Sequence, residues 1–174
     1  EARPNYNVVS SGATGHAEAM EVVYDPSKVS YAQLLDIFWH QVNPTTANQQ
    51  FCDRGRQYRS AIFPANKGQE QLARQSLQAY EDSGKFGRGR KLVTEIMPLG
   101  AFWRAEEYHQ DYYLKNPELY RYYRSRCGRD DYLRQVWGEE ADAEEPASVI
   151  PPPALLLKYG AVLGGAWAGG AVLA

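Results

Sequence analysis

The chain has 174 residues, with 19 Lys and Arg against 21 Asp and Glu, 13% aromatic residues and two cysteines. This length fits a single domain that folds without cross-links. The aromatic content excludes a disordered chain, and two cysteines are too few for a disulfide scaffold. They fit either a reducing compartment or one redox pair. A net charge of -2 provides no basic surface for counterion release, so we expect no nucleic acid as a partner.

Hydrophobic periodicity predicts alternating strands and helices up to residue 97 and helices alone near the end of the domain. Apolar and polar side chains alternate in residues 18–24, before Asp25-Pro26, which is typical of a half-buried strand. Ser30 and Gln33 have the spacing of a capping box, and apolar residues then recur at helical spacing. The expected elements are strand 18–24, helix 30–42, loop 45–55, strand 58–63, helix 66–81, an exposed connection at 84–89, strand 92–97, and short helices around 106–114, 117–126 and 130–137.

This order of elements predicts an α+β fold, a two-layer sandwich in which helices cover a small mixed or antiparallel sheet. An acidic stretch and several prolines predict a linker at residues 139–153, after a domain at residues 1–138. Residues 154–174 form an apolar tail rich in Ala and Gly. Its small-xxx-small spacing is a weak sign of contact with a membrane. A disordered or artefactual extension is the other open alternative. Residues 1–7 lack a signal-peptide pattern, and we expect a domain that is incomplete at its N-terminus.

The usual metal and hydrolase motifs do not occur in the sequence. Cys52 and Cys127 are far apart, and the three histidines lack the paired spacing of zinc ligands. No Ser stands in a Gly-x-Ser-x-Gly turn, and no phosphate-cradling loop is present. Tyr and Arg interleave in residues 120–134, but apolar residues at helical spacing favour amphipathic helices with solvated arginines. We therefore expect no metal site and no nucleic-acid site.

Five polar and aromatic segments occur in an order and spacing that identify a known family. They are TGHAE at 14–18, NPTT at 43–46, CDRGRQYRSAIF at 52–63, AEEYHQDYYLKNP at 105–117 and YRSRCGRD at 123–130. Together they resemble the A-type peptide methionine sulfoxide reductases, which act on the S epimer. The resemblance runs from about residue 5 to residue 137. It implies the reduction of methionine-(S)-sulfoxide in peptides and proteins by thiol chemistry, with neither a metal nor an organic cofactor.

The resemblance also implies roles for individual residues. Glu18 matches the family's acid and would donate a proton to the departing oxygen, which requires burial to raise its pKa. Tyr58 and Tyr112 match tyrosines that hydrogen-bond this oxygen, and Asp53 matches a carboxylate that orders the pocket. Tyr120 matches a further pocket tyrosine. From the residues alone, a solvated Glu, core tyrosines and an Asp in a turn remain open alternatives.

The family's nucleophile is a Cys in a Gly-Cys-Phe-Trp segment upstream of the position of TGHAE, and this sequence contains no such segment. After attack the nucleophile becomes a sulfenic acid, which a second Cys resolves to a disulfide. The resemblance implies that Cys127 is the resolving cysteine, because the family's resolving Cys commonly lies in this region. Arg126 and Arg129 flank it and would favour its thiolate. Cys52 is next to Asp53, whose charge opposes a thiolate. For both cysteines, a small buried hydrophobe is the open alternative.

By this resemblance the chain is a peptide-methionine (S)-S-oxide reductase, whose partners are methionine-sulfoxide peptides and proteins, with thioredoxin as the reductant. We expect it to be a cytoplasmic monomer, with an organellar or tail-anchored location as the open alternatives. We also expect it to be inactive as it stands, since the nucleophile is absent. One alternative is a non-catalytic module that still binds sulfoxide peptides. Another is a globular fragment tethered by its tail.

Overall fold

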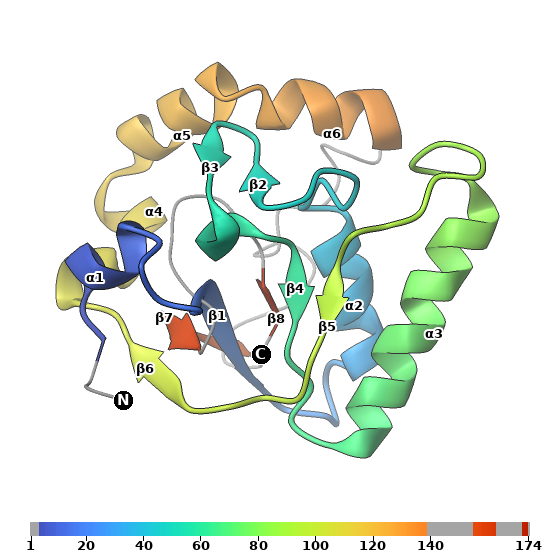
Figure 1. Cartoon of the computed structure of the whole chain (residues 1–174), viewed down its shortest axis with the longest axis horizontal. Helices are drawn as coiled ribbons and strands as arrows, with labels where there is room; N and C mark the ends of the chain where they lie inside the picture. Colours follow the sequence, from blue (N-terminus) through green and yellow to red (C-terminus); the bar gives the residue numbers. More distant parts are fainter. Residues whose placement is uncertain (1–3, 139–154, 163–171, 174) are drawn as a thin grey trace.

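The computed structural model describes residues 4–138, 155–162 and 172–173, and Figure 1 shows the arrangement of their elements. A six-stranded mixed sheet has the order β5-β4-β8-β1-β7-β6, and β2 and β3 form a separate ribbon. The strands are β1 (Ala17–Tyr24), β2 (Gln49–Gln50), β3 (Asp53–Arg54), β4 (Ala61–Ile62), β5 (Glu95–Ile96), β6 (Phe102–Arg104), β7 (Leu155–Val162) and β8 (Val172–Leu173). The helices are α1 (Tyr6–Ser10), α2 (Tyr31–Trp39), α3 (Lys67–Ser83), α4 (Tyr112–Lys115), α5 (Pro117–Arg126) and α6 (Arg129–Trp137), with 3-10 turns η1 (Arg56–Tyr58) and η2 (Glu107–His109).

The α+β class and the principal helices are as predicted. The capping box at the start of α2 is formed, since Gln33 N donates to Ser30 Oγ at 3.2 Å and Ser30 N donates to Gln33 Oε1 at 2.9 Å. Asn66 caps α3, which ends at Gly84 with a left-handed φ of +67°. Figure 1 shows α2 and α3 at the β5 end of the sheet, and α5 and α6 across the end where the ribbon lies.

Short elements account for the predictions that were wrong. The expected loop at 45–55 contains the β2–β3 ribbon, whose strands of two residues are too short to show periodicity. The strands expected at 58–63 and 92–97 shrink to β4 and β5, and Tyr58 belongs to η1. The five-residue helix α1 was not predicted. Phe102 and Trp103 form part of β6, a strand of three residues that was not predicted, and are half-buried.

The end of the chain provides both sheet neighbours of β1. Strand β7 pairs antiparallel with β1 from Ala17 opposite Val162 to Tyr24 opposite Leu155, and it also pairs with β6. Strand β8 pairs parallel with β1 and with β4. The tail thus contributes two strands to the sheet, which its composition did not predict, while residues 139–153 lie outside the described part. Within the described residues, no helix is long and apolar enough to cross a membrane.

The main core joins the sheet to α2, α3 and α6. Trp39 and Phe38 of α2 are almost fully buried, and Trp39 Nε1 donates to Ser76 Oγ of α3 at 2.7 Å. Along β1, Met20 and Val22 contact this core, whereas Ala17 and Ala19 contact a second, smaller cluster. Because successive residues of a strand face opposite sides, Glu18 lies on the same side of β1 as Met20 and Val22.

Candidate active site

Glu18 is a buried carboxyl group at the start of β1. Its residue is only 2% exposed, and neither of its carboxyl oxygens has a hydrogen-bond partner with ordinary geometry among the described residues. Burial, and then the negative charge of Asp53, raise the pKa of Glu18 to about 9, although a contribution from the Tyr58 hydroxyl lowers it somewhat. The side chain is therefore a neutral carboxylic acid at pH 7, able to donate a proton.

Two tyrosines lie next to this acid. Tyr58 is in η1, and burial, followed by the charges of Glu18 and Asp53, raises its pKa to about 12. Tyr6 is in α1, and burial and then Glu18 raise its pKa as well. The buried Gln57 links the two elements, since its Nε2 donates to Ser10 O at 2.9 Å. Both phenols consequently keep their protons near neutral pH and can donate hydrogen bonds to an oxygen of a ligand.

Tyr6 was missed by the sequence analysis. The helix that carries it has five residues, which is too short for a periodic signal. Two structural contacts fix its position: its backbone N donates to Glu106 Oε1 at 3.1 Å, and its ring centroid lies 4.7 Å from that of His109. The AEEYHQ segment therefore positions Tyr6, although the two are about one hundred residues apart in the sequence. A local sequence pattern cannot indicate such a contact.

Asp53 connects this acid group to the C-terminal helices. It is the first residue of β3, and the Tyr123 hydroxyl of α5 donates to its Oδ1 at 2.5 Å. Burial raises the pKa of Asp53, and the Tyr123 hydrogen bond and the Arg129 charge oppose that rise. Tyr123, like Tyr6, was not assigned a site role from the sequence. The predicted ordering role of Asp53 is compatible with these contacts and stays a prediction.

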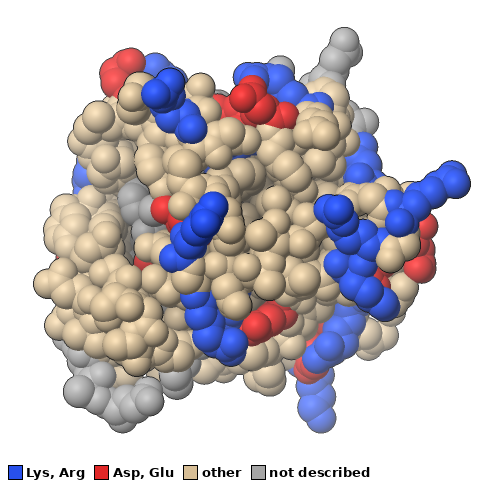
Figure 2. Space-filling model, turned by 45° about the horizontal axis from the view of Figure 1, so that its top comes forward, with Lys and Arg blue, Asp and Glu red and all other residues tan. Residues whose placement is uncertain are grey.

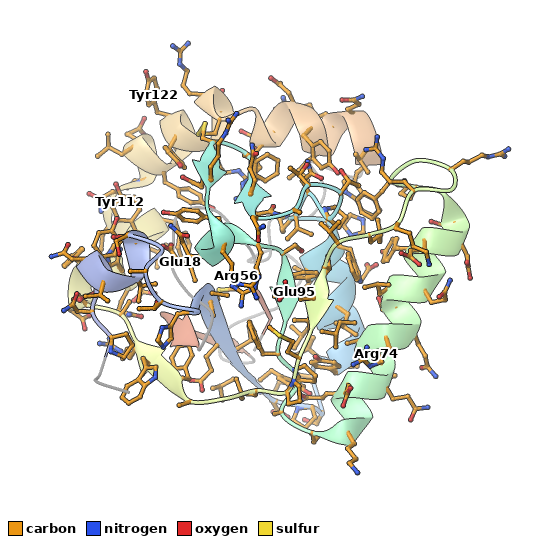
Figure 3. All side chains as sticks on the ribbon, viewed as in Figure 1. Glu18, Arg56, Arg74, Glu95, Tyr112 and Tyr122 are labelled. Atoms are coloured by element: carbon orange, nitrogen blue, oxygen red, sulfur yellow. A yellow bond between two sulfur atoms is a disulfide. The ribbon has the colours of Figure 1, made fainter. Side chains whose placement is uncertain are left out.

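A pocket of about 310 Å³ opens beside Asp53. Of the predicted site residues, Asp53, Tyr112, Tyr120 and Cys127 line it, whereas Glu18 and Tyr58 do not. Figure 3 shows Tyr112 and Glu18 in the same part of the molecule, on α4 and β1. The structure thus brings the predicted residues into two groups that share Asp53. The other lining residues are mostly aromatic or apolar and come from the ribbon, α5 and α6: Phe51, Leu119, Tyr122, Tyr123, Arg124 and Arg129.

The two cysteines form a disulfide with each other. The Cα atoms of Cys52 and Cys127 are 5.1 Å apart, so the chain contains no free thiol in this state. Cys127 lines the pocket and Cys52 is exposed. The cysteine count left one redox pair open, whereas the motifs predicted separate roles for the two residues. The resolving role of Cys127 remains a prediction.

The structure also bears on the metal-binding side chains and the surface charges of the described residues. Among the described residues, no group of three or more His, Cys, Asp and Glu side chains is placed to hold a metal ion. On the face in Figure 2, uncharged residues form a broad surface, and Lys and Arg side chains stand at several separate places, often beside acids. A protein that tracks a phosphate backbone needs a continuous basic surface.

Comparisons with known proteins show the family to which the chain belongs. The family profile described as "Peptide methionine sulfoxide reductase" matches residues 1–141. A protein of Bacillus licheniformis named peptide methionine sulfoxide reductase MsrA is 43% identical over 141 residues, covering 81% of this chain and 77% of the relative. The Bacillus subtilis protein of the same name is 43% identical over 135 residues, with 78% and 75% covered.

Solved structures give the same result. Methionine sulfoxide reductase A of Corynebacterium diphtheriae superposes with a TM-score of 0.58 at 36% identity, over 66% of this chain and 57% of that one. The reduced form of Mxr1 from Saccharomyces cerevisiae superposes with a TM-score of 0.50 at 34% identity, over 55% of this chain and 50% of the yeast chain. The chain therefore belongs to the peptide methionine sulfoxide reductase family, which comprises oxidoreductases.

Proposed function

We propose that this chain carries the substrate-binding and proton-donating site of a reductase for methionine-(S)-sulfoxide in peptides and proteins. The observation that carries the proposal is the neutral Glu18, buried beside the phenols of Tyr58 and Tyr6. A sulfoxide oxygen is a strong hydrogen-bond acceptor that becomes more negative as the sulfur-oxygen bond breaks. Two phenol donors and one acid match this change in charge.

The reaction requires a thiolate as well as this acid. A cysteine thiolate attacks the sulfoxide sulfur while Glu18 gives its proton to the oxygen, and the sulfur-oxygen bond then breaks. The oxygen passes as a hydroxyl group to the cysteine sulfur while the new bond between the two sulfurs breaks, so that methionine is reduced by two electrons and the cysteine is oxidised to a sulfenic acid. A second thiol attacks the sulfenic acid, which releases water and forms a disulfide. The second step is the one we assign to Cys127, once its bond with Cys52 has been reduced.

Thioredoxin is the reductant that we propose for the disulfide at the end of the cycle. A dithiol can reduce a protein disulfide through two exchange steps. In the present state the exposed Cys52 also gives such a dithiol access to the bond with Cys127, which must be reduced before Cys127 can resolve the sulfenic acid. Because reduced thioredoxin must be maintained at the site of action, we place the protein in the cytoplasm, and we propose that it acts as a monomer. Gel filtration and cell fractionation test these two points.

The proposed function is tested by binding and by reduction. The chain should bind a peptide with methionine-(S)-sulfoxide at least ten-fold more tightly than the R epimer or the unoxidised peptide, a difference of about 1.4 kcal/mol. A longer chain with the family's Gly-Cys-Phe-Trp segment before residue 1 should form one equivalent of methionine per molecule. Equal binding of the two epimers, or no methionine from the longer chain, would contradict the proposal.

A specific observation favours a second candidate, a module that binds sulfoxide peptides without reducing them. Both cysteines of the sequence are occupied by their mutual disulfide, so no thiolate is available in this state. The two candidates differ in the longer chain: the reductase forms methionine there, whereas the binding module retains the sulfoxide unchanged.

A further inference from the structure

The disulfide connects the wall of the pocket to the β2–β3 ribbon. Cys52 is the second residue of the two-residue turn between β2 and β3, and Cys127 is the residue at which α5 ends. Cys127 lines the pocket, whereas Cys52 is exposed to solvent. A reductant can therefore reach the disulfide from the solvent. Cleavage of the disulfide then releases Cys127, which is part of the pocket wall.

Helix α5 is weakly attached to the rest of the molecule. None of its residues is buried, and Leu119 and Tyr122 leave 60% and 64% of their surface exposed although both line the pocket. The Tyr123 hydroxyl donates to Asp53, the residue next to Cys52. This hydrogen bond and the disulfide join α5 to the same point of the ribbon. A helix without buried side chains has little apolar burial to hold it once a cross-link is lost.

Helix α6 and the turn of the β2–β3 ribbon are held by contacts other than the disulfide. In α6, Leu133 and Trp137 are buried in the main core, and the guanidinium of Arg129 donates to Gln41 O at 3.0 Å. The same guanidinium lies 4.5 Å from the ring centroid of Phe51 in the ribbon turn. Phe51 has a φ of +53°, which a bulky residue adopts only where its surroundings hold it.

The boundary between α5 and α6 allows a change of direction. Gly128 separates Cys127 from Arg129, has a φ of +71°, and has no other atom within 4 Å of the position of a Cβ. Glycine tolerates a wide range of backbone angles, so this residue can act as a hinge. With the disulfide broken, α5 can therefore move while α6 and the ribbon stay in place.

We propose that the Cys52–Cys127 disulfide is a redox latch that holds α5 against the substrate pocket and that a dithiol reductant releases. In the oxidised state the aromatic wall is fixed in the geometry that binds the substrate. In the reduced state α5 exchanges among several positions, and the pocket binds more weakly because it must be ordered on binding. The weaker binding rests on the proposed function, whereas the release of α5 does not.

The release is an ordinary thiol–disulfide exchange. One thiolate of the dithiol attacks Sγ of the exposed Cys52, and the thiolate of Cys127 leaves. The second thiol of the dithiol then attacks its own mixed disulfide and frees Cys52. The dithiol loses two electrons and becomes a disulfide, and its two protons pass to the two cysteines. No metal or further oxidant is needed.

Hydrogen exchange of the whole chain before and after reduction with dithiothreitol tests the latch. We expect the backbone amides of residues 117–126 to exchange at least ten-fold faster after reduction, at exchange times short enough that those of α3 stay protected in both states. The affinity for a methionine-(S)-sulfoxide peptide should fall about five-fold or more. The matched control is the double variant Cys52→Ser/Cys127→Ser, which should show the fast exchange at once and no response to dithiothreitol.

Two outcomes separate the latch from the proposed function. If exchange in residues 117–126 is the same in both redox states of the unmodified chain, the latch is overturned, whatever the double variant does. If exchange rises on reduction but no sulfoxide peptide binds in either state, the release of α5 stands and the proposed function fails. Exchange that rises equally in α3 at these short times would mean general unfolding and would also overturn the latch.

Discussion

Glu18 stays protonated near neutral pH because of its position in a strand and not because of its neighbours in the sequence. It stands between Ala17 and Ala19 and faces the same side of β1 as the half-buried Met20 and the buried Val22, which is the side that packs on the main core. Desolvation of its carboxylate is the first cause of its raised pKa, and the charge of Asp53 is the second. The alternation of residues 18–24 predicted the strand, but only the family resemblance predicted the role of the carboxyl.

The buried acid should make stability depend on pH. Because the pKa of Glu18 is about 9 in the folded chain and 4.5 in a model carboxyl, the folded state binds the extra proton between these values. This contribution to stability is complete below pH 4.5 and is lost as the pH rises, by up to about 1.4 kcal/mol per unit. Glu18→Gln should remove this slope, as measured by urea unfolding between about pH 5 and pH 8.

The control for this measurement is Glu21→Gln on the same strand, which should keep the slope of the unmodified chain. A Glu18→Gln variant whose free energy of unfolding runs parallel to that of the unmodified chain over this pH range would show that Glu18 is already ionised in the folded state.

The family resemblance predicts that Cys127, and not Cys52, attacks the sulfenic acid of the nucleophile. In the longer chain with the Gly-Cys-Phe-Trp segment, Cys127→Ser should stop thioredoxin-driven turnover and leave one equivalent of methionine per molecule, because the sulfenic acid is not resolved. Steady-state and single-turnover assays of methionine formation check this. If Cys52→Ser has this effect and Cys127→Ser does not, the assignment is reversed.

At the scale of elements, β1 depends on segments that are distant in sequence. The strand that carries Glu18 pairs with β7 and β8, and β6 reaches the sheet through β7. The helices α2 and α3 could be predicted because capping residues and periodicity are local signals. The partner of a strand is not a local signal, so the sequence could not show that the tail completes the sheet.

The pairing of β7 can be tested with one proline. Ala161 lies opposite Glu18 on β1 and Trp103 on β6, so a proline there removes a ladder hydrogen bond on one side or the other. Ala161→Pro should lower the protection of β1 or β6 amides against hydrogen exchange and destabilise the chain by at least the roughly 1 kcal/mol of one lost hydrogen bond. The matched control is Ser148→Pro in the predicted linker. Equal protection in the two variants would contradict the pairing.

For the molecule as a whole, the disulfide is a cross-link between distant parts of the chain. It joins residues separated by 75 positions and therefore restricts the unfolded chain considerably. Removal of such a cross-link should lower the free energy of unfolding by about 2–4 kcal/mol. Urea unfolding of the Cys52→Ser/Cys127→Ser variant against the oxidised chain measures this difference. A variant as stable as the oxidised chain would contradict this expectation.

The chain of 174 residues should not reduce sulfoxide peptides, even with excess dithiothreitol. An acid and two phenols can polarise the sulfur-oxygen bond, but a correctly placed thiolate must attack the sulfur, and such placement contributes roughly 7–11 kcal/mol to the lowering of the barrier. The assay compares the chain with the Cys52→Ser/Cys127→Ser variant. Methionine formation above that of the variant would mean that one of these cysteines acts as the nucleophile.

The protonation state of Glu18 is the central claim, and its carboxyl carbon can report it directly. In the ¹³C NMR spectrum of the uniformly labelled chain, the resonance that disappears in Glu18→Gln belongs to this carboxyl. Followed across a pH titration, its chemical shift should remain that of a protonated acid at pH 7 and change with a midpoint near pH 9. A midpoint close to 4.5, the value of a model carboxyl, would contradict the proton-donor site.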